Sequence, residues 1–378
     1  MKKTALYLII VILFGFSCNR KMSPDMIALD KISNFQDLFN ASLTHGVECF
    51  RIPSLVTAPN GYLIAAIDER VPHCGDLRDN RDINIVLRIS KDNGNSWSKV
   101  KTVVDFPDGQ SASDPSMIVD GETGHIFLFY NFMDLDNENG IYYLHVTESK
   151  DNGESWSEPR DITSQVTRQE WHEDFKFITS GRGIQTRDGT ILHTLVNVTQ
   201  NSVYVYGSKD HGKTWFYKGT PVKPGDESKI VELDNGDWMI NSRDKEKTGI
   251  RYVHVSNDNG DTWKTRTDKQ LIDPGNNASL IRYTSVRDGY NKSRLLFSNA
   301  KMKDGRKNMT VRISYDEGKT WTEGRTIYDG PSAYSTLTVL ENGEIGLLFE
   351  KDDYSQNSFV KFSLEWLTEG EDKYVEPR

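Results

Sequence analysis

The sequence predicts an all-β fold of the β-propeller type, and three observations lead to that prediction. Few long stretches show the 3.6-residue period of an amphipathic helix. Short alternating apolar runs occur along the whole chain and end at Asn-Gly or Asp-Gly pairs, which are typical of hairpin turns. One eight-residue turn motif occurs five times at nearly regular intervals. A unit repeated in this way along an all-β chain is typical of propeller blades.

The repeated turn has the pattern Ser-x-Asp-x-Gly-x-(Ser/Thr)-Trp, and its tryptophans are 59, 59, 48 and 58 residues apart. The Asp can accept hydrogen bonds from the turn backbone, the Gly provides a position with positive φ, and the Trp provides a large ring for burial. We therefore interpret the motifs as structural turns and not as calcium or ligand sites. The five copies are SKDNGNSW (90–97), SKDNGESW (149–156), SKDHGKTW (208–215), SNDNGDTW (256–263) and SYDEGKTW (314–321).

Strands are predicted on both sides of these turns. An alternating strand precedes each copy, over residues 83–90, 142–149, 203–208, 251–256 and 309–314. Hairpin tips lead into further strands over residues 59–68, 187–196, 234–243 and 341–350. The segment FVKFSLEWL, residues 359–367, is predicted to be the closing strand that completes the last blade.

The first 18 residues predict an export signal. Lys2 and Lys3 form a positive start, ALYLIIVILFGF is an apolar run, and FSC brings a small residue before Cys18. The run is too short and too close to the terminus for an ordinary membrane span. Two interpretations remain, a plain signal peptide or a lipoprotein signal in which Cys18 is lipidated. Both predict an exported bacterial protein that is periplasmic, secreted or an outer-membrane lipoprotein.

The composition excludes several functions. Lys and Arg number 46 against 55 Asp and Glu, so the net charge is −9, and without a basic block we expect no nucleic-acid partner. An anionic substrate would need locally clustered arginines. The sequence has no His-rich or Cys-rich metal spacing, so we expect no catalytic metal and no cofactor. Cys49 and Cys74 could pair in an exported protein, or could remain two free or buried thiols.

The repeated turn is the Asp box, which by itself implies blades and not an activity. Combined with FRIPSLV at residues 50–56, it makes the chain resemble the bacterial exo-sialidases (neuraminidases) from Phe50 to Leu367. The resemblance implies a six-bladed β-propeller that cleaves terminal sialic acid. The domains it implies are an export signal (1–18), a short N-terminal linker (19–32), a sialidase β-propeller catalytic domain (33–370) and a C-terminal tail (371–378).

A site for this substrate must meet three chemical demands. Sialic acid carries a carboxylate on its anomeric carbon, which arginines can bind bidentately because a guanidinium does not deprotonate. The nucleophile must not repel that carboxylate, and a neutral Tyr activated by a Glu meets this demand. An unaided Tyr has a pKa of about 10 and is a poor nucleophile, so the Glu is required. A carboxylic acid must also protonate the leaving oxygen.

The resemblance implies a clamp of three arginines. Arg51 in FRIP matches the first, and Glu350 in LLFE resembles the carboxylate that holds it. Arg243 in GDESKIVELDNGDWMINSRDK matches the second. Arg306 in KDGRKNMTVRIS is chosen as the third over Arg312, because the alternating strand before the last Asp box could point Arg312 outward.

The catalytic residues are implied in the same way. Tyr334 in DGPSAYSTLTVL matches the nucleophile, raised into a pore by a Gly-Pro turn, and Glu227 matches the base that takes its proton. The acid matches Asp76, which lies on a loop that also holds Asp79 and Asp82.

Two further residues are implied to bind the sugar. Arg70 in AAIDER and Asp114 in SASDPSM resemble family residues near the C4 hydroxyl and the N-acetyl group. The Gly-rich stretch 171–189 resembles a family segment on the glycerol side, with no contact assigned within it.

Each of these residues alone has an ordinary explanation, such as a surface ion pair for Arg243 or a strand aromatic for Tyr334. The occurrence of all these residues together, in the order in which the family has them, favours a catalytic function. We predict a retaining exo-α-sialidase that acts on the sialylated glycans of glycoproteins, glycolipids and oligosaccharides, and that is a monomer. The alternatives are a trans-sialidase with the same site and a non-catalytic glycan-binding propeller. A glycosidase for neutral sugars would leave three arginines without a carboxylate to hold.

Overall fold

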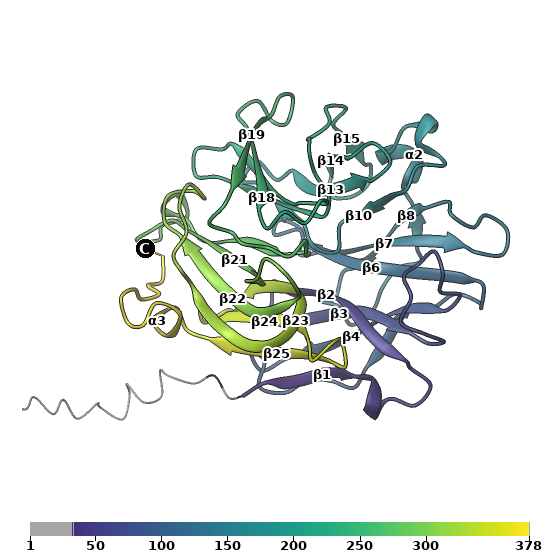
Figure 1. The fold of residues 1–378 in the computed structure, drawn as a ribbon, viewed down its shortest axis with the longest axis horizontal. Coiled ribbons are helices and arrows are strands. Elements are labelled where there is room, and N and C mark those ends of the chain that lie inside the picture. Colours follow the sequence, from purple (N-terminus) through teal and green to yellow (C-terminus); the bar gives the residue numbers. More distant parts are fainter. Residues whose placement is uncertain (1–31, 33, 378) are drawn as a thin grey trace, which may run out of the picture. The chain divides into compact units, whose positions relative to one another are not determined.

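The computed structural model describes residue 32 and residues 34–377. The predicted export signal and nearly all of the predicted linker lie outside these residues. The described part is all-β, with 25 strands and only five short helical turns (Figure 1). None of its helices is long and apolar enough to cross a membrane. The helical turns are η1 (Ala41–Leu43), α2 (Thr163–Val166), η2 (Gln169–Trp171), η3 (Val286–Asp288) and α3 (Leu364–Leu367).

The described strands form five sheets, whose strands are antiparallel except where β6 meets β11. The first sheet contains β2 (Cys49–Thr57), β3 (Leu63–Arg70), β4 (Ile83–Ser90) and β5 (Lys101–Val104). The second contains β6 (Gln110–Val119), β7 (Ile126–Asp134), β8 (Tyr143–Ser149), β9 (Arg160–Asp161) and β11 (Gly181–Arg182). The third contains β10 (Lys176–Ile178), β12 (Ile184–Gln185), β13 (Ile191–Asn197), β14 (Ser202–Ser208) and β15 (Phe216–Tyr217).

The remaining strands form a four-stranded and a seven-stranded sheet. The fourth sheet contains β16 (Ser228–Glu232), β17 (Trp238–Arg243), β18 (Arg251–Ser256) and β19 (Lys264–Asp268). The fifth contains β20 (Ser279–Thr284), β21 (Arg294–Ala300), β22 (Lys307–Ser314), β23 (Arg325–Val339), β24 (Ile345–Lys351), β25 (Gln356–Phe362) and β1 (Gln36–Asn40). The strands predicted before the Asp boxes are confirmed as β4, β8, β14, β18 and β22 within two residues.

The closing segment differs from the prediction. Only residues 359–362 of the predicted strand 359–367 are in a strand, and Leu364–Leu367 form the single turn of α3. The Ser363 side chain caps this turn by accepting a hydrogen bond from the amide of Trp366. The last strand, β25, pairs with β24 and with β1, the first of the described strands. The two ends of the described chain are therefore joined through one sheet.

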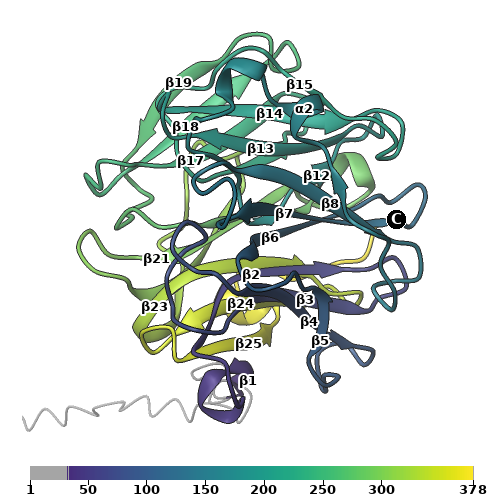
Figure 2. The ribbon, with the colours of Figure 1, turned by 90° about the vertical axis from the view of Figure 1, so that its right-hand side faces the viewer.

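The hydrophobic core lies between successive sheets. Residues of β2–β4 pack against β6 and β7, residues of β6–β8 against β13 and β14, and residues of β16–β18 against β20 and β21. Residues of β24, β25 and β1 pack against the first sheet. Each sheet therefore buries both faces against its neighbours, and Figure 2 shows the resulting stack edge-on.

The Asp boxes form local hydrogen-bonded turns, as predicted. In the first box, Asp92 accepts hydrogen bonds from the amide of Ser96 at 2.8 Å and from its hydroxyl at 2.5 Å, and Ser90 accepts one from the amide of Gly94. A Cβ added to Gly94 would lie 2.7 Å from Phe359, and its φ is +78°. The glycine is therefore needed both for the turn and for close packing on the neighbouring β25.

We expect the free energy of unfolding to fall as the pH is lowered from about 4 to about 2. Hydrogen bonds from Ser96 and Thr262 lower the pKa of Asp92 and Asp258 to about 2 in the folded protein, against about 3.9 in an unfolded chain. Their stabilising effect is therefore complete above the unfolded value and is lost as the pH falls through the folded one. Urea unfolding midpoints between pH 5 and pH 2.5 measure this loss of stability. A midpoint that does not change over this range would contradict the prediction.

Candidate active site

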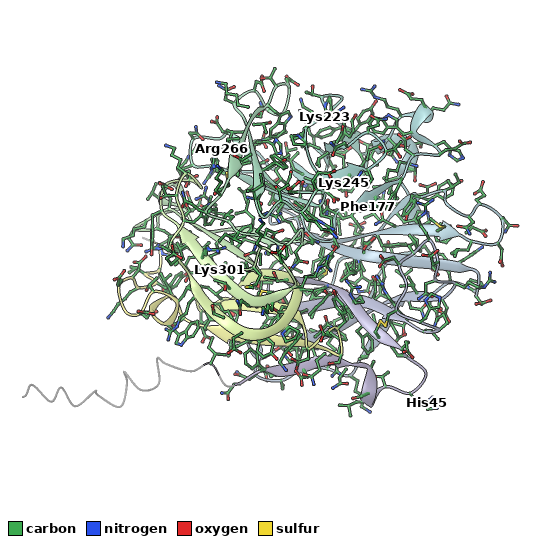
Figure 3. All side chains as sticks on the ribbon, in the orientation of Figure 1. His45, Phe177, Lys223, Lys245, Arg266 and Lys301 are labelled. Atoms are coloured by element: carbon green, nitrogen blue, oxygen red, sulfur yellow. A yellow bond between two sulfur atoms is a disulfide. The ribbon has the colours of Figure 1, made fainter. Side chains whose placement is uncertain are left out.

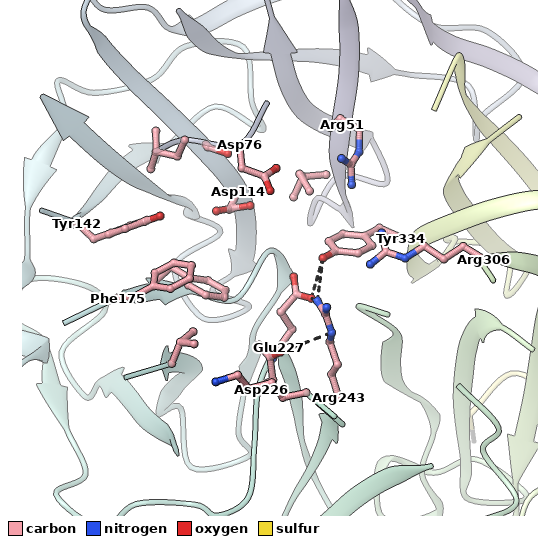
Figure 4. A pocket seen from close by; sticks show the side chains of 16 residues that line it. Arg51, Asp76, Asp114, Tyr142, Phe175, Asp226, Glu227, Arg243, Arg306 and Tyr334 are labelled. Carbon is pink, nitrogen blue, oxygen red and sulfur yellow. Dashed lines mark hydrogen bonds and ion pairs between the residues drawn. The ribbon is translucent and has the colours of Figure 1, made fainter. Parts of the chain in front are cut away.

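The predicted site residues converge on one pocket with a volume of about 390 Å³ (Figure 4). Seven of the nine line it, namely Arg51, Asp76, Asp114, Glu227, Arg243, Arg306 and Tyr334. The other two, Arg70 and Glu350, are fully buried and bind the lining residues Asp76 and Arg51. With Phe177 of β10, residues from all five sheets contribute to this single cavity.

Strand bulges direct three of these side chains into the pocket. The register shifts in β2, β6 and β23 beside Arg51, Asp114 and Tyr334, respectively. Ile52 and Asp114 have φ angles of +66° and +63°, which are sparsely populated for residues other than glycine. A bulge turns a side chain out of the regular alternation of its strand, and strained residues concentrate at functional sites. A proline follows each of these two residues in the sequence, which is the local signal for both irregularities.

Glu350 orients the first clamp arginine. Its carboxylate accepts hydrogen bonds from Arg51 Nε at 2.7 Å and from the amides of Ile52 and Tyr334 at 2.9 and 3.0 Å. Burial raises the pKa of Glu350, but Arg51 and the two amides outweigh that effect, so the pKa is lowered. The same carboxylate therefore fixes both the arginine and the backbone of Tyr334.

Tyr354 connects two of the clamp arginines, although the sequence analysis did not identify it. The Arg51 guanidinium lies over the Tyr354 ring at 4.1 Å from its centroid, and Arg306 Nη1 donates a hydrogen bond to the Tyr354 hydroxyl at 3.1 Å. Tyr354 lies in the turn between β24 and β25, where Asp352, Asp353 and Tyr354 all have positive φ. Three such residues in a row place the ring over Arg51.

Arg306 carries the one clamp charge with no carboxylate partner among residues 34–377. Arg51 pairs with Glu350, and Arg243 pairs with Glu227. Arg306 donates only to the Tyr354 hydroxyl and, at 3.4 Å, to a backbone carbonyl. Its cation is therefore available to an anion that enters the pocket.

Arg312, the alternative third arginine, lies elsewhere. It is only 1% exposed, donates to Asn299 and does not line the pocket. The expectation that its strand could point it outward was wrong, because the Arg312 side chain is buried and donates a hydrogen bond to Asn299 of the neighbouring strand β21.

Tyr334 and Glu227 are in direct contact. The Tyr334 hydroxyl donates to Glu227 Oε2 at 2.8 Å, and Arg243 Nη1 donates to the Tyr334 hydroxyl at 3.2 Å (Figure 4). Burial and Glu227 raise the pKa of Tyr334 well above its ordinary value, against the opposite effect of the three arginines. The phenol is therefore neutral in the empty pocket, and it could act as a nucleophile only if a base took its proton.

Asp76 lies at the mouth of the pocket and is held by Arg70. Its side chain is 80% exposed, and Oδ1 is 2.8 Å from Arg70 Nη1. The surrounding protein raises the pKa of Asp76, but Arg70, with Arg51 and Arg306, outweighs that effect and lowers it. Arg70 also donates to Asp68 and to the carbonyls of Cys74 and Gly75. It therefore organises the acid loop from behind and does not itself line the pocket.

The structure joins Cys49 to Cys74 in a disulfide, which resolves the two possibilities that the sequence leaves open. The Cα atoms are 5.7 Å apart, within the ordinary range for the bond. Cys49 begins β2, two residues before Arg51, and Cys74 precedes Asp76 by two residues. The bond therefore ties the acid loop to the strand that carries the first clamp arginine.

Removal of this disulfide is expected to lower the free energy of unfolding by about 3 kcal/mol, because the bond closes a loop of 25 residues in the unfolded chain. Urea unfolding of the Cys49→Ala, Cys74→Ala double variant measures the change. The matched control repeats the urea unfolding of both proteins in a thiol reductant. Under these conditions the wild type should be no more stable than the double variant. Equal stability of the two proteins without reductant would contradict the expectation.

Asp114 belongs to a buried pair of carboxyl groups. Asp68 Oδ1 accepts a hydrogen bond from the amide of Asp114 at 2.9 Å, and Asn131 donates to Asp114 Oδ2 at 3.0 Å. Burial, and then the charge of Asp68, raise the pKa of Asp114 well above its ordinary value. A protonated Asp114 can donate a hydrogen bond to a sugar oxygen or amide carbonyl in the pocket.

An apolar wall stands opposite the arginines. Leu77, Tyr142, Phe175, Phe177 and Val198 line that side, and Figure 4 places Tyr142 and Phe175 across the pocket from Arg306. Phe175 and Phe177 belong to the Gly-rich stretch 171–189 that the sequence analysis left without assigned contacts. The pocket thus presents cations on one side and rings on the other. Among the described residues, no group of three His, Cys, Asp or Glu side chains could hold a metal ion.

Comparisons with known proteins identify relatives of this chain. The BNR repeat-like domain family matches residues 62–347. A sialidase of Micromonospora viridifaciens is 36% identical over 85% of this chain and 52% of its own length. A sialidase of Bacteroides fragilis is 31% identical over 80% of this chain and 60% of its own length. The chain therefore spans only about half to three fifths of these relatives.

A solved structure supports the same relationship. The Hadza microbial sialidase Hz136 superposes with a TM-score of 0.80 at 30% identity, covering 88% of this chain and 69% of that one. The chain belongs to the sialidase family with BNR repeats.

Proposed function

We propose that the protein is an exo-α-sialidase that hydrolyses terminal sialic acids from glycoconjugates with retention of configuration. The observation that carries the proposal is the meeting of three arginines with the Tyr334–Glu227 pair in one pocket. Arg306 has no carboxylate partner among the described residues, so a substrate carboxylate would complete the clamp. A neutral sugar would leave that half-buried cation without a carboxylate partner.

The proposed reaction begins at Tyr334. The substrate carboxylate lies between Arg51, Arg243 and Arg306, which brings the anomeric carbon next to the Tyr334 hydroxyl. Glu227 accepts the phenolic proton as the oxygen attacks the anomeric carbon, and Asp76 donates a proton to the glycosidic oxygen as its bond breaks. The aglycone leaves as an alcohol, and an aryl glycoside, in which the anomeric carbon is bonded to the phenolic oxygen of Tyr334, remains on the enzyme.

The second step of the proposed reaction reverses these roles. Asp76, now ionised, takes a proton from a water molecule that attacks the anomeric carbon. The bond to Tyr334 breaks, and Glu227 returns the proton to the phenolate. Two inversions at the same carbon give net retention. The positive charge of the three arginines stabilises the phenolate that forms during both steps.

We further propose that the sheets are the blades of a six-bladed propeller. The supporting observation is the long strand β23, which pairs through residues 325–331 with β22 and through residues 332–339 with β24. If β23 serves two blades, the seven-stranded sheet divides into β20–β23 and β23–β25 with β1. The disulfide Cys49–Cys74 supports export to an oxidising compartment. Lipidation of Cys18, the predicted domain boundaries and the monomeric state remain part of this proposal.

Proton NMR of the reaction with a sialyllactose tests the proposed function. Free sialic acid should form first as the α-anomer and then mutarotate. A β-anomer formed first would overturn the retaining mechanism, and an intramolecular anhydro product would favour the trans-sialidase alternative. Absence of any product, with sialyllactose still bound, would favour the non-catalytic alternative.

A further inference from the structure

A second, larger cavity lies beside the candidate active site. Its volume is about 680 Å³, and it is formed by α2, the start of β8 and the segment before β10. Tyr143, Asp161, Arg168, Gln169, His172 and Lys176 provide most of its functional groups. None of these residues has a role in the reaction proposed above.

The two cavities share a wall. Phe175 and Phe177 line the active-site pocket, while Lys176, between them, lines the second cavity. Alternate residues of a strand point to opposite faces, so this short segment separates the two spaces. In the same way, Tyr142 lines the active-site pocket and the adjacent Tyr143 lines the second cavity. A ligand in the second cavity would therefore lie one strand away from a sugar in the active site.

Both cavities also lie at the same edge of the second sheet. Tyr143 pairs with Phe132 at the end of β7, and the adjacent Asn131 holds the site residue Asp114. The amide of Leu144 in β8 donates a hydrogen bond to the Thr163 hydroxyl in α2, and Figure 1 shows these two elements next to each other. One branched or extended glycan could thus reach both spaces from the same side.

Lys176 provides hydrogen-bond donors at the base of the cavity. Its side chain is almost fully buried, and Nζ donates one hydrogen bond, to the carbonyl of His172 at 2.9 Å. An ammonium group can donate three hydrogen bonds, and the bond to His172 is the only one that Lys176 forms with the described residues. Buried donors without partners are unfavourable, so hydroxyl oxygens of a ligand would satisfy them.

The remaining groups suit an uncharged sugar. The Tyr143 and His172 rings are 6.3 Å apart and give apolar faces for sugar C–H groups. Asp161 and Gln169 are exposed and can accept and donate hydrogen bonds to hydroxyls. An acidic ligand fits less well, because Asp161 would repel it and Arg168 already lies 3.7 Å from Glu170.

We propose that this cavity is an accessory subsite for a neutral hexose of the glycan that carries the sialic acid. The inference rests on the proposed sialidase function for its biological role, but binding of the hexose does not depend on turnover. The subsite would favour extended glycans over short substrates whose aglycone cannot reach across the shared wall.

The experiment compares two substrates in three variants. His172→Ala and Lys176→Met are expected to raise KM about tenfold for a sialylated neutral pentasaccharide, with kcat unchanged, and to leave an aryl sialoside unaffected. The control His45→Ala removes an exposed histidine at a distant rim of the molecule and should change neither (Figure 3). Equal losses on both substrates would overturn the proposal, since the residues would then act on the active site itself.

A binding measurement separates this proposal from the proposed function. Saturation-transfer NMR with the asialo tetrasaccharide alone should detect binding to the wild type and to His45→Ala, and much weaker binding to His172→Ala and Lys176→Met. Circular dichroism establishes that the variants are folded. If the wild type hydrolyses no sialoside but binds the tetrasaccharide, the function fails and the subsite stands. If the wild type does not bind the tetrasaccharide, the subsite proposal is wrong.

Discussion

Tyr334→Phe is expected to lower kcat for sialoside hydrolysis about a thousandfold or more, with the protein still folded. The substitution removes one oxygen, which is the atom that accepts a hydrogen bond from Arg243 at 3.2 Å and donates one to Glu227 at 2.8 Å. Without it no glycosyl-enzyme can form. Substrate binding should change much less, because Arg51 and Arg306, which lie beside the ring, keep their other contacts. The loss should therefore appear in kcat with KM within a few fold of the wild type.

A matched substitution distinguishes lost chemistry from lost packing. Tyr206 is also fully buried, and its hydroxyl has no hydrogen-bond partner among the described residues. Tyr206→Phe should therefore leave kcat and KM unchanged. Glu227→Gln should resemble Tyr334→Phe, because the neutral phenol would then have no base. Wild-type turnover in Tyr334→Phe would exclude Tyr334 as the nucleophile and leave its contacts with the clamp as its only role.

The fold could be predicted largely because its strongest signal is local. Each Asp box forms its hydrogen bonds within eight residues, as Ser90, Asp92 and Ser96 do in the first copy, so sequence spacing alone reveals it. The pairing of the closing strand with β1 could not be predicted in this way. Its partner, β1, lies more than 300 residues away in the sequence, and no pattern in either segment identifies the pairing. The N-cap residue Ser363 was the overlooked signal for α3.

In the candidate site, too, residues in local sequence motifs could be predicted, and residues defined by long-range contacts could not. Arg51, Glu227 and Tyr334 were found because each stands in a distinctive local phrase that resembles the sialidase family. Tyr354 was missed because its importance arises only from contacts with Arg51 and Arg306, which lie 303 and 48 residues away in the sequence. The apolar wall was missed for a similar reason, since a strand phenylalanine facing a pocket has the same sequence pattern as one facing a core.

Asp76→Asn is expected to reduce hydrolysis of natural sialosides about a thousandfold but hydrolysis of a nitrophenyl sialoside only about tenfold. A sugar alkoxide is a poor leaving group and needs a proton, whereas a nitrophenolate leaves without one. Steady-state kcat/KM for the two substrates measures the difference. The matched control is Asp79→Asn, an exposed carboxyl on the same loop that does not line the pocket, which should leave both rates unchanged.

The pH dependence should follow from the contact with Arg70. Because the pKa of Asp76 is lowered in the empty pocket, its acid form is a minor species at neutral pH. For natural sialosides kcat/KM should therefore fall about tenfold per pH unit above that pKa, while the nitrophenyl substrate should show little of this decrease. A natural-substrate profile that stays flat through neutral pH would require a different acid.

Asp114 is the other carboxyl group in the pocket that could serve as the general acid in place of Asp76, since burial and Asp68 raise its pKa well above the ordinary value. Its geometry argues against this role. Its carboxyl group accepts a hydrogen bond from the buried Asn131, and a proton donated from there would leave a second buried anion beside Asp68. Asp76 is exposed at the pocket mouth, where an aglycone leaves, and can be reprotonated from solvent. Asp114→Asn should therefore lower activity on both substrates by the same factor, through weaker sugar binding, whereas only Asp76→Asn should discriminate between leaving groups.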